Sequence, residues 1–323
     1  MTRNPSITVP PRWLHGLAWL TVCATLPLLF LGAGVTSFDV GMVDPEGYQH
    51  PWVIARVLFE NNGFSWLLEY GHRAMGMIVG LLAIALAIGF GLTTTGRTRW
   101  LGLLALALVV AQGMLGKYRV DLNAMYGRTY ALAHGCFAQI VFATLVCLVV
   151  VTSKRWQRID TDIPVSPQLK RWSLLALLVV FGQLLLGGLV RHKAALLGPR
   201  GHLLGAFVVV VVVAWLAKLA LESENRQRFI GTLIGLAVLI GVQLVLGVES
   251  WLAKFFVPDV RLEAVAPSPV HSEWIRTAHY LVGTLIFAHC VILALKANLQ
   301  PSLTGGEVTE PVHPAPRSWE GVA

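Results

Sequence analysis

The stretch from Gly201 to Leu219 reads GHLLGAFVVVVVVAWLAKL, an apolar run with His202 near its start and Lys218 near its end. A helix needs about 20 such residues to cross the hydrocarbon core of a bilayer. Counting this run, eight apolar stretches predict spans over roughly 14–35, 67–92, 100–117, 130–152, 172–190, 201–219, 229–248 and 274–296. We therefore expect an all-α polytopic membrane protein with eight transmembrane helices.

The composition agrees with this class and argues against others. The chain is 55% hydrophobic and only 13% charged, and its mean hydropathy is +0.67. The formal net charge of +8 is scattered over every loop and forms no single stripe, so we expect no nucleic-acid partner. The four cysteines all fall inside predicted spans without CxxC spacing, which favours small buried apolar side chains over disulfides.

The charges of the loops predict the orientation in the membrane. Residues 1–12 are polar and show no cleavable signal pattern, and the first apolar stretch is long enough to be a true span. A small majority of the 25 Lys and Arg residues lie on the side of the N-terminus, which favours cytoplasmic N- and C-termini. The basic segment from Lys154 to Arg171 contributes most. A bacterial inner membrane is the simplest location.

The chain also contains an internal repeat of the pattern QxxLG. It appears as Gln112-Gly-Met-Leu-Gly116 and Gln243-Leu-Val-Leu-Gly247, at nearly the same distance in sequence after His72 and His202, and a related Gln183-Leu-Leu-Leu-Gly187 lies between them. Because each half has an even number of spans, both halves keep the same orientation, as parallel repeats about an axis along the membrane normal. We expect two four-helix bundles, over 1–152 and 172–297, a cytoplasmic linker over 153–171, and a disordered cytoplasmic tail over 298–323.

Four histidines recur near the starts of the second, fourth, sixth and eighth spans: His72, His134, His202 and His279. Ionisable side chains inside spans are costly, which favours function over packing. Two imidazoles on facing helices of a four-helix bundle can hold a haem iron between them. A zinc site is less consistent, because no cysteine or carboxylate cluster completes four ligands. A proton relay is an alternative that does not explain the pairing by halves.

Arginines stand beside the histidines in sequence. Such side chains are suited to pair with haem propionates, although snorkelling to the membrane interface is an equal alternative. The weak candidates are Arg73, Arg128, Arg200 and Arg276.

One carboxylate separates the two halves chemically. Glu69 lies three residues before His72, and side chains at this spacing share a helix face. The corresponding residues before the other histidines are Ala131, Pro199 and Arg276, none of them acidic. We therefore expect the N-terminal half to perform the chemistry and the C-terminal half to hold a permanent cofactor. The alternative for Glu69 is a favourable charge at a helix N-terminus.

The Glu-x-x-His-Arg pattern, the QxxLG repeats and the four histidines resemble the haem A synthase family over about residues 14–297. That family acts in cytochrome c oxidase assembly. The resemblance implies oxidation of the C8 methyl group of haem O to a formyl group, with water as the oxygen source through a hydroxylated intermediate.

The resemblance also implies roles for residues. His202 and His279 would ligate a resident haem b, His72 and His134 would bracket the substrate haem O, and Glu69 would be the catalytic carboxylate. Implied partners are a haem O synthase as donor, membrane lipid and an unidentified electron acceptor, and a homo-oligomer is left open.

One departure from the family lies in the first outer loop. Some members carry a cysteine pair there, and the loop Ser37–Trp66 has none. We expect its acids, Asp39, Asp44 and Glu46, to be solvated or to cap loop turns.

Two other functions fit the four histidines. The first is a di-haem b-type electron-transfer cytochrome without a substrate, and the second is a non-catalytic haem carrier. Neither explains why only one half carries an acidic residue at the position of Glu69.

Overall fold

The computed structural model describes residues 10–44, 63–157, 163–192, 197–255 and 269–299. Eight of its helices are long and apolar enough to cross a membrane, which confirms the predicted fold class. With the short α6, they are α1 Arg12–Ser37, α3 Phe64–Thr93, α4 Gly96–Asp121, α5 Asn123–Thr152, α6 Lys154–Gln157, α7 Pro167–His192, α8 Leu197–Leu221, α9 Arg226–Phe255 and α10 Pro269–Asn298. The predicted tail lies almost wholly outside the described residues.

Several helices extend beyond the spans expected from hydropathy. The clearest case is the α4–α5 corner, where the predicted spans end at 117 and begin at 130, whereas the helices end at Asp121 and begin at Asn123. Residues 118–129 include several polar side chains but no proline, so both helices continue well into this segment. Hydropathy marks the part of a helix that suits lipid, not the point where its hydrogen bonding ends.

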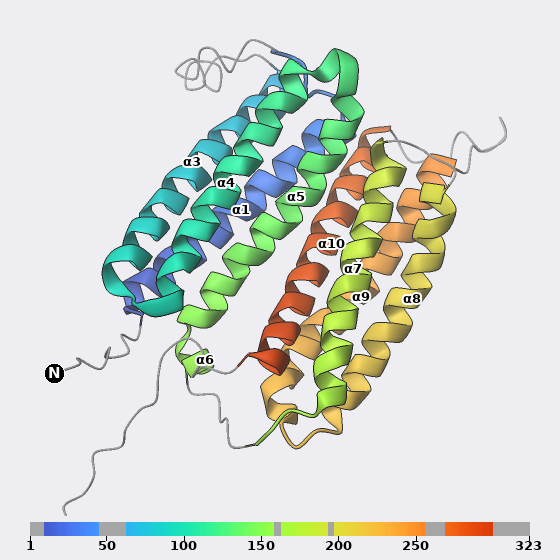
Figure 1. Cartoon of the computed structure of the whole chain (residues 1–323). Helices are drawn as coiled ribbons and strands as arrows, with labels where there is room; N and C mark the ends of the chain where they lie inside the picture. Colours follow the sequence, from blue (N-terminus) through green and yellow to red (C-terminus); the bar gives the residue numbers. More distant parts are fainter. Residues whose placement is uncertain (1–9, 45–62, 158–162, 193–196, 256–268, 300–323) are drawn as a thin grey trace, which may run out of the picture.

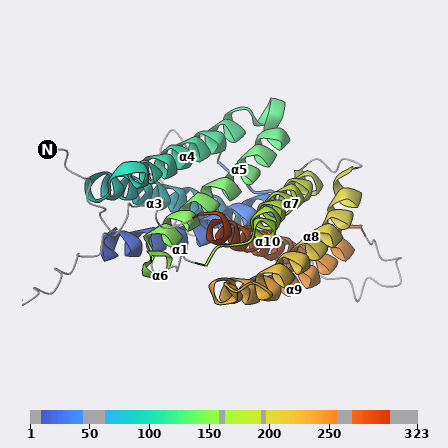
Figure 2. The ribbon, with the colours of Figure 1, turned by 60° about the horizontal axis from the view of Figure 1, so that its bottom comes forward.

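The long helices form two groups of four, as Figures 1 and 2 show: α1, α3, α4 and α5 in one, and α7, α8, α9 and α10 in the other. Each group has its own apolar core. The groups meet where α5 and α10 pack together, and small residues make the approach close: Ala143 of α5 belongs to the C-terminal core and Ala288 of α10 to the N-terminal core. The predicted pair of four-helix bundles is therefore present.

Successive helices within each group run in opposite directions, as Figure 1 shows. As a result α3, α5, α8 and α10 all begin at the same end of the molecule, the upper end in Figure 1. These are the helices that carry the four histidines, which therefore lie towards one end.

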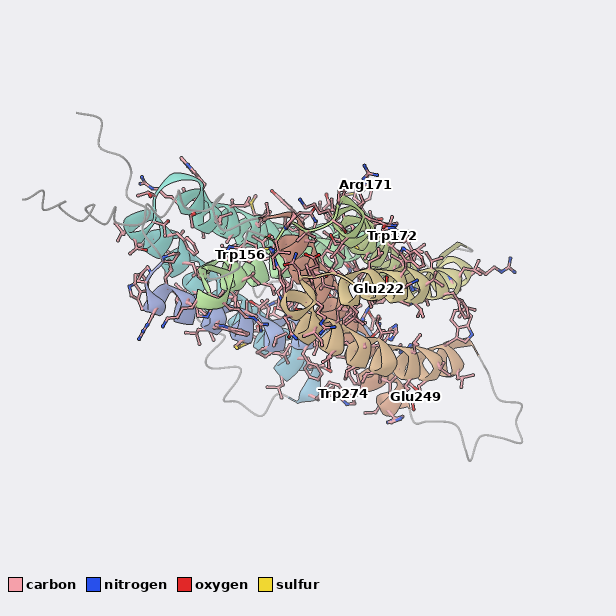
Figure 3. The ribbon with its side chains drawn as sticks, turned by 90° about the horizontal axis from the view of Figure 1, so that it is seen from below. Trp156, Arg171, Trp172, Glu222, Glu249 and Trp274 are labelled. Carbon is pink, nitrogen blue, oxygen red and sulfur yellow. The ribbon has the colours of Figure 1, made fainter. Side chains whose placement is uncertain are left out.

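The opposite end carries the linker and a band of tryptophans. Figure 3 shows this end, with Trp156 of α6 and Trp172 of α7 labelled. Trp172 packs on Trp215 of α8 with ring centroids 6.0 Å apart. Tryptophan is enriched at membrane–water interfaces, so this end matches one boundary of the bilayer.

The outward surfaces of the helices are apolar. Leu92 is 81% exposed, and Leu81 and Phe207 are also exposed, as suits side chains that face lipid. All four cysteines are free. Cys290 is buried as expected, but the prediction of burial is wrong for Cys23, which lies on an outward face of α1 where a thiol is tolerated as a small apolar group.

The end of α1 directs the chain back over the bundle. Asp39 adopts the left-handed conformation with φ of 54°, and the N–H of Val40 donates to the carbonyl of Val35 at 3.0 Å. This turn is the usual way to end a helix and reverse its path. It brings Val43 and Asp44 onto α3, next to Glu69.

Candidate functional site

The four histidines form two pairs, one within each helix group. The ring centroids of His72 on α3 and His134 on α5 are 6.4 Å apart, with an angle of 81° between the ring planes. Those of His202 on α8 and His279 on α10 are 6.1 Å apart, at 82°. The structure thus brings together the residues that the sequence paired.

These separations match two axial ligands of one metal ion. A bond from imidazole nitrogen to a first-row metal is about 2.0–2.1 Å, and the nitrogen lies about 1.1 Å from the ring centre. Two imidazoles on opposite sides of one ion therefore place their centroids about 6.2 Å apart. Among the described residues no group of three or more His, Cys, Asp or Glu could hold a metal ion. Two facing imidazoles are the ligand set of a haem iron.

A glycine on the preceding helix lies against each of the four rings. A Cβ atom added to any of these glycines would lie 2.6–3.2 Å from the nearest ring atom. Only glycine leaves room for the imidazole at this depth of the helix contact. The pairs are Gly32 with His72, Gly116 with His134, Gly187 with His202, and Gly247 with His279. The last three glycines are those of the QxxLG motifs.

The motif glutamines lie beside the same histidines. The Nε2 of Gln112 donates to the carbonyl of His134 at 3.0 Å, and that of Gln183 donates to the carbonyl of His202 at 2.8 Å. The Nε2 of Gln243 lies 3.3 Å from Nε2 of His279. The glutamines therefore tie the histidine-bearing helices to their neighbours.

The first helix replaces glutamine with a backbone acceptor. Leu28 stands four residues before Gly32, as Gln112 does before Gly116. Its carbonyl accepts a hydrogen bond of 3.0 Å from Nδ1 of His72. Because Nδ1 must then carry the proton, Nε2 of His72 is left with a lone pair to ligate a metal.

A cavity of about 420 Å³ lies at the C-terminal pair, within the size range of cofactor pockets. His202 and His279 line it, together with Gly187 and Gly247. Within the described part of the chain, the buried Nδ1 atoms of both histidines have no hydrogen-bond partner. Facing imidazoles, glycines that leave space and a largely apolar wall fit a flat haem.

The predicted propionate arginines occupy different surroundings. Arg276 lines the cavity and forms an ion pair with Glu273 on its own helix. Arg73 is bound to Glu69, while Arg128 and Arg200 are exposed.

Arg191 also lines the cavity and was missed. It ends the segment Leu186-Gly-Gly-Leu-Val-Arg191, and a basic residue at the end of a span is also the usual interfacial anchor.

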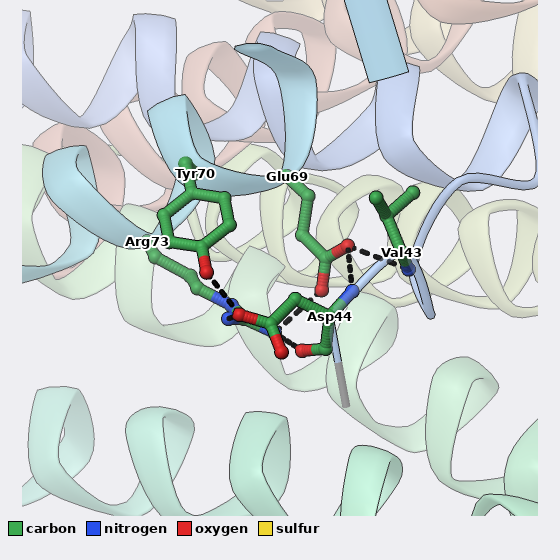
Figure 4. Close-up of polar contacts among 5 residues, drawn as sticks. All are labelled: Val43, Asp44, Glu69, Tyr70 and Arg73. Atoms are coloured by element: carbon green, nitrogen blue, oxygen red, sulfur yellow. Dashed lines mark hydrogen bonds and ion pairs between the residues drawn. The ribbon is translucent and has the colours of Figure 1, made fainter. Parts of the chain in front are cut away.

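Glu69 lies at the centre of a polar cluster, shown in Figure 4. It is 4% exposed, and its Oε2 accepts the backbone N–H groups of Val43 at 2.8 Å and Asp44 at 3.2 Å. Its Oε1 pairs with Arg73 at 2.5 Å. Both carboxylate oxygens are therefore held, by the loop that follows α1 and by the residue after His72.

Asp44 and Tyr70 complete the cluster. The Tyr70 hydroxyl donates to the Asp44 carboxylate, and the Asp44 carbonyl accepts from Arg73 at 2.6 Å. The expectation that Asp44 is solvated or caps a loop turn is wrong, because the turn after α1 carries it onto α3. No sequence spacing signals this contact, since Asp44 and Arg73 lie far apart in the chain.

Comparison with known proteins completes the picture. The COX15-CtaA family, described as cytochrome oxidase assembly protein, matches residues 45–199. A haem A synthase of Symbiobacterium thermophilum is 29% identical over 253 residues, which cover 67% of this chain and 79% of that protein. A haem A synthase of Halalkalibacterium halodurans is 25% identical over 190 residues, covering 58% of this chain and 62% of that protein.

Somewhat less than half of the chain is thus similar to the COX15-CtaA family. The stretch matched by the family contains Glu69, His72 and His134 and stops short of His202. It leaves out α1 and includes α7 of the other helix group.

The Gly32 contact generates a prediction. A Cβ at residue 32 would lie 2.6 Å from Cε1 of His72, so Gly32→Ala must displace the ring. In a His202→Ala background, where only the N-terminal pair is complete, we expect this substitution to weaken ferric haem binding about tenfold, the order of a 1–3 kcal/mol overpacking cost. Optical titration measures the affinity.

Gly16→Ala on the same helix is the matched control, because nothing lies within 4 Å of its added Cβ. Equal haem affinities for the two alanine variants would show that the glycine contact does not position His72.

Proposed function

We propose that this protein is a haem A synthase, which oxidises the C8 methyl group of haem O to a formyl group and so supplies haem A to cytochrome c oxidase. The observation that carries the proposal is an asymmetry between similar halves. Both hold a histidine pair at coordination spacing, but only the N-terminal half places a buried, arginine-paired carboxylate three residues from a ligand. The similarity of residues 45–199 to the COX15-CtaA family and two relatives named haem A synthase support the same activity.

Under this proposal the two halves divide the work. In residues 1–152, His72 and His134 bracket the substrate haem O. In residues 172–297, His202 and His279 ligate a resident haem b, in the cavity described above. Haem b, when bound, supplies a one-electron acceptor. Because the resident haem would occupy the C-terminal pair, the N-terminal pair stays available for a substrate haem that binds and is released.

The chemistry explains why a carboxylate is needed. With water as the oxygen source, conversion of a methyl group to a formyl group releases four electrons and four protons. A fixed anion near the reacting group stabilises positive charge that develops there, and a carboxylate also accepts a proton. We assign this role to Glu69. Arg73 and the amides of Val43 and Asp44 hold the carboxylate in place, which keeps its position independent of solvent.

Other assignments complete the proposal. Among the predicted propionate partners, the cavity supports Arg276, and the exposed Arg128 and Arg200 suit the interface. The protein would lie in a bacterial inner membrane with both termini in the cytoplasm. A haem O synthase would deliver the substrate, whose apolar tail suits lipid, and an unidentified acceptor would take the electrons.

A second candidate would also explain the near identity of the two histidine pairs. Centroid separations of 6.4 and 6.1 Å and angles of 81° and 82° are what a di-haem b-type electron-transfer cytochrome would show. That candidate, like a haem carrier, assigns no task to Glu69.

Analysis of extracted haems tests the proposal. Co-expression with a haem O synthase in a host that lacks haem A should yield haem A or its hydroxylated intermediate, separated by chromatography. Haem b alone in the folded protein, with haem O present in the membrane, would instead indicate the cytochrome.

The carboxylate itself is tested by Glu69→Gln. We expect haem binding to persist and haem A formation to fall by at least about a hundredfold, the usual contribution of a general acid–base group. Glu222→Gln is a matched control, because Glu222 is also paired with a basic residue four positions away, Lys218, and is exposed in the other half. Normal haem A production by Glu69→Gln would remove this residue from the mechanism.

The division of labour is tested by removing ligands one half at a time. Substitution of His202 or His279 by alanine should abolish the haem b that copurifies with the protein. Substitution of His72 or His134 should leave it in place while haem A formation stops. Pyridine haemochrome spectra of the purified variants measure this, and equal loss of haem b from both halves would favour the cytochrome.

A further inference from the structure

Two side chains of the C-terminal half line the cavity and also contact the N-terminal half. They are Arg191 on α7 and Tyr280 on α10, and the guanidinium of Arg191 lies over the Tyr280 ring, 5.4 Å from its centroid. Whatever fills the cavity therefore meets a stacked pair that spans the boundary between the halves.

Arg191 contacts α1, the helix that supports His72. Its Nη2 donates to the carbonyl of Ala33 at 2.5 Å and to Oγ of Ser37 at 2.7 Å. Ala33 directly follows Gly32, against which the His72 ring packs. A shift of the guanidinium thus acts on the backbone that positions one histidine of the N-terminal pair.

Tyr280 contacts α5, the helix that carries the other histidine. Its hydroxyl donates to the carbonyl of Gly135 at 3.3 Å and accepts a hydrogen bond of 2.8 Å from Nε2 of Gln139. Gly135 follows His134, just as Tyr280 follows His279. Gln139 is only 1% exposed, so the contact is fixed by packing as well as by hydrogen bonds.

We propose that the Arg191–Tyr280 pair couples the two haem sites, so that occupation of the C-terminal cavity fixes the geometry of the N-terminal histidine pair. This inference rests on the proposed function, which assigns a haem to each half. A ligand in the cavity restricts both side chains, and their hydrogen bonds restrict α1 and α5. Contacts that link two sites in this way produce a coupling free energy that is the same in both directions. Arg191 and Tyr280 are positioning residues, not catalytic ones.

The biological sense of the coupling is order of assembly. A substrate site that is completed only when the resident haem is present would not begin an oxidation without an electron acceptor. The coupling enforces this without a moving domain, because the contacts already exist between packed helices.

The test measures haem affinity in the full-length protein. Ferric haem b is titrated into protein whose C-terminal site is already filled with haem b, and into the His202→Ala/His279→Ala protein, whose C-terminal pair is removed. Optical and electron paramagnetic resonance spectra report the two-histidine haem of the N-terminal half. We expect filling of the C-terminal site to tighten N-terminal binding about tenfold, within the range typical of coupled sites.

The ratio of interest is the N-terminal haem affinity with the C-terminal site filled, divided by the affinity with the C-terminal pair removed. Two substitutions should bring this ratio close to one while the resident haem stays bound. Arg191→Gln removes the contacts with Ala33 and Ser37, and Tyr280→Phe removes the contacts with Gly135 and Gln139 but keeps the ring. Arg171→Gln is the matched control and should preserve the ratio, because Arg171 is an exposed arginine near the start of the same helix as Arg191. If the Arg191→Gln protein loses the resident haem, the affinity ratio of the Tyr280→Phe protein alone tests the coupling.

The outcomes separate this inference from the proposed function. The coupling would be overturned if the N-terminal half bound haem equally well with the C-terminal site filled and with its histidine pair removed. It would also be overturned if the roughly tenfold ratio were unchanged in both Arg191→Gln and Tyr280→Phe. Either result would leave the enzyme proposal standing. Failure of His72 and His134 to bind haem in any background would overturn the assignment of a haem to each half.

Discussion

The fit of an imidazole ring against a glycine on the preceding helix is the interaction on which the site depends. It occurs four times, once for each histidine, and it sets how closely the helices of each group approach. A larger residue at any of these glycines would push either the ring or the helix away. Since two rings must stand about 6 Å apart to share a metal ion, displacements of a few tenths of an ångström matter. The helix packing and the capacity to bind haem thus follow from the same contacts.

Much of this architecture could be predicted from the sequence, because membrane helices are recognised by their length and apolar composition. Repeat spacing identified the four histidines and their pairing by halves. Glu69 was found because its three-residue offset from His72 is a local property of a helix. Each of these inferences uses residues that are near in sequence or related by the duplication.

The contacts that escaped prediction join residues that are distant in sequence and unrelated by the repeat. Asp44 reaches Glu69 and Arg73 only because α1 ends in a left-handed residue and the chain turns back, and no pattern marks that path. In the sequence, nothing distinguishes Arg191 and Tyr280 from other polar residues of the spans. Their contacts arise only because α7 and α10 pack against the N-terminal helix group. Arg73 stands directly after His72, and its guanidinium pairs with Glu69 four residues earlier, a contact that the spacing of a helix permits.

The meeting of α5 with α10 has a consequence for how the chain is built. These are equivalent helices of the two repeats, and the contacts of α1 with α10 and of α7 with α5 are also equivalent to one another. Equivalent surfaces that meet in this reciprocal manner form an isologous interface, the arrangement found in a twofold symmetric dimer. The molecule therefore has the geometry of a homodimer of four-helix subunits joined into one polypeptide. Because the two subunits are fused, their sequences can differ. Glu69 in one half and Arg191 in the other each appear once, which is impossible in a symmetric dimer of identical subunits.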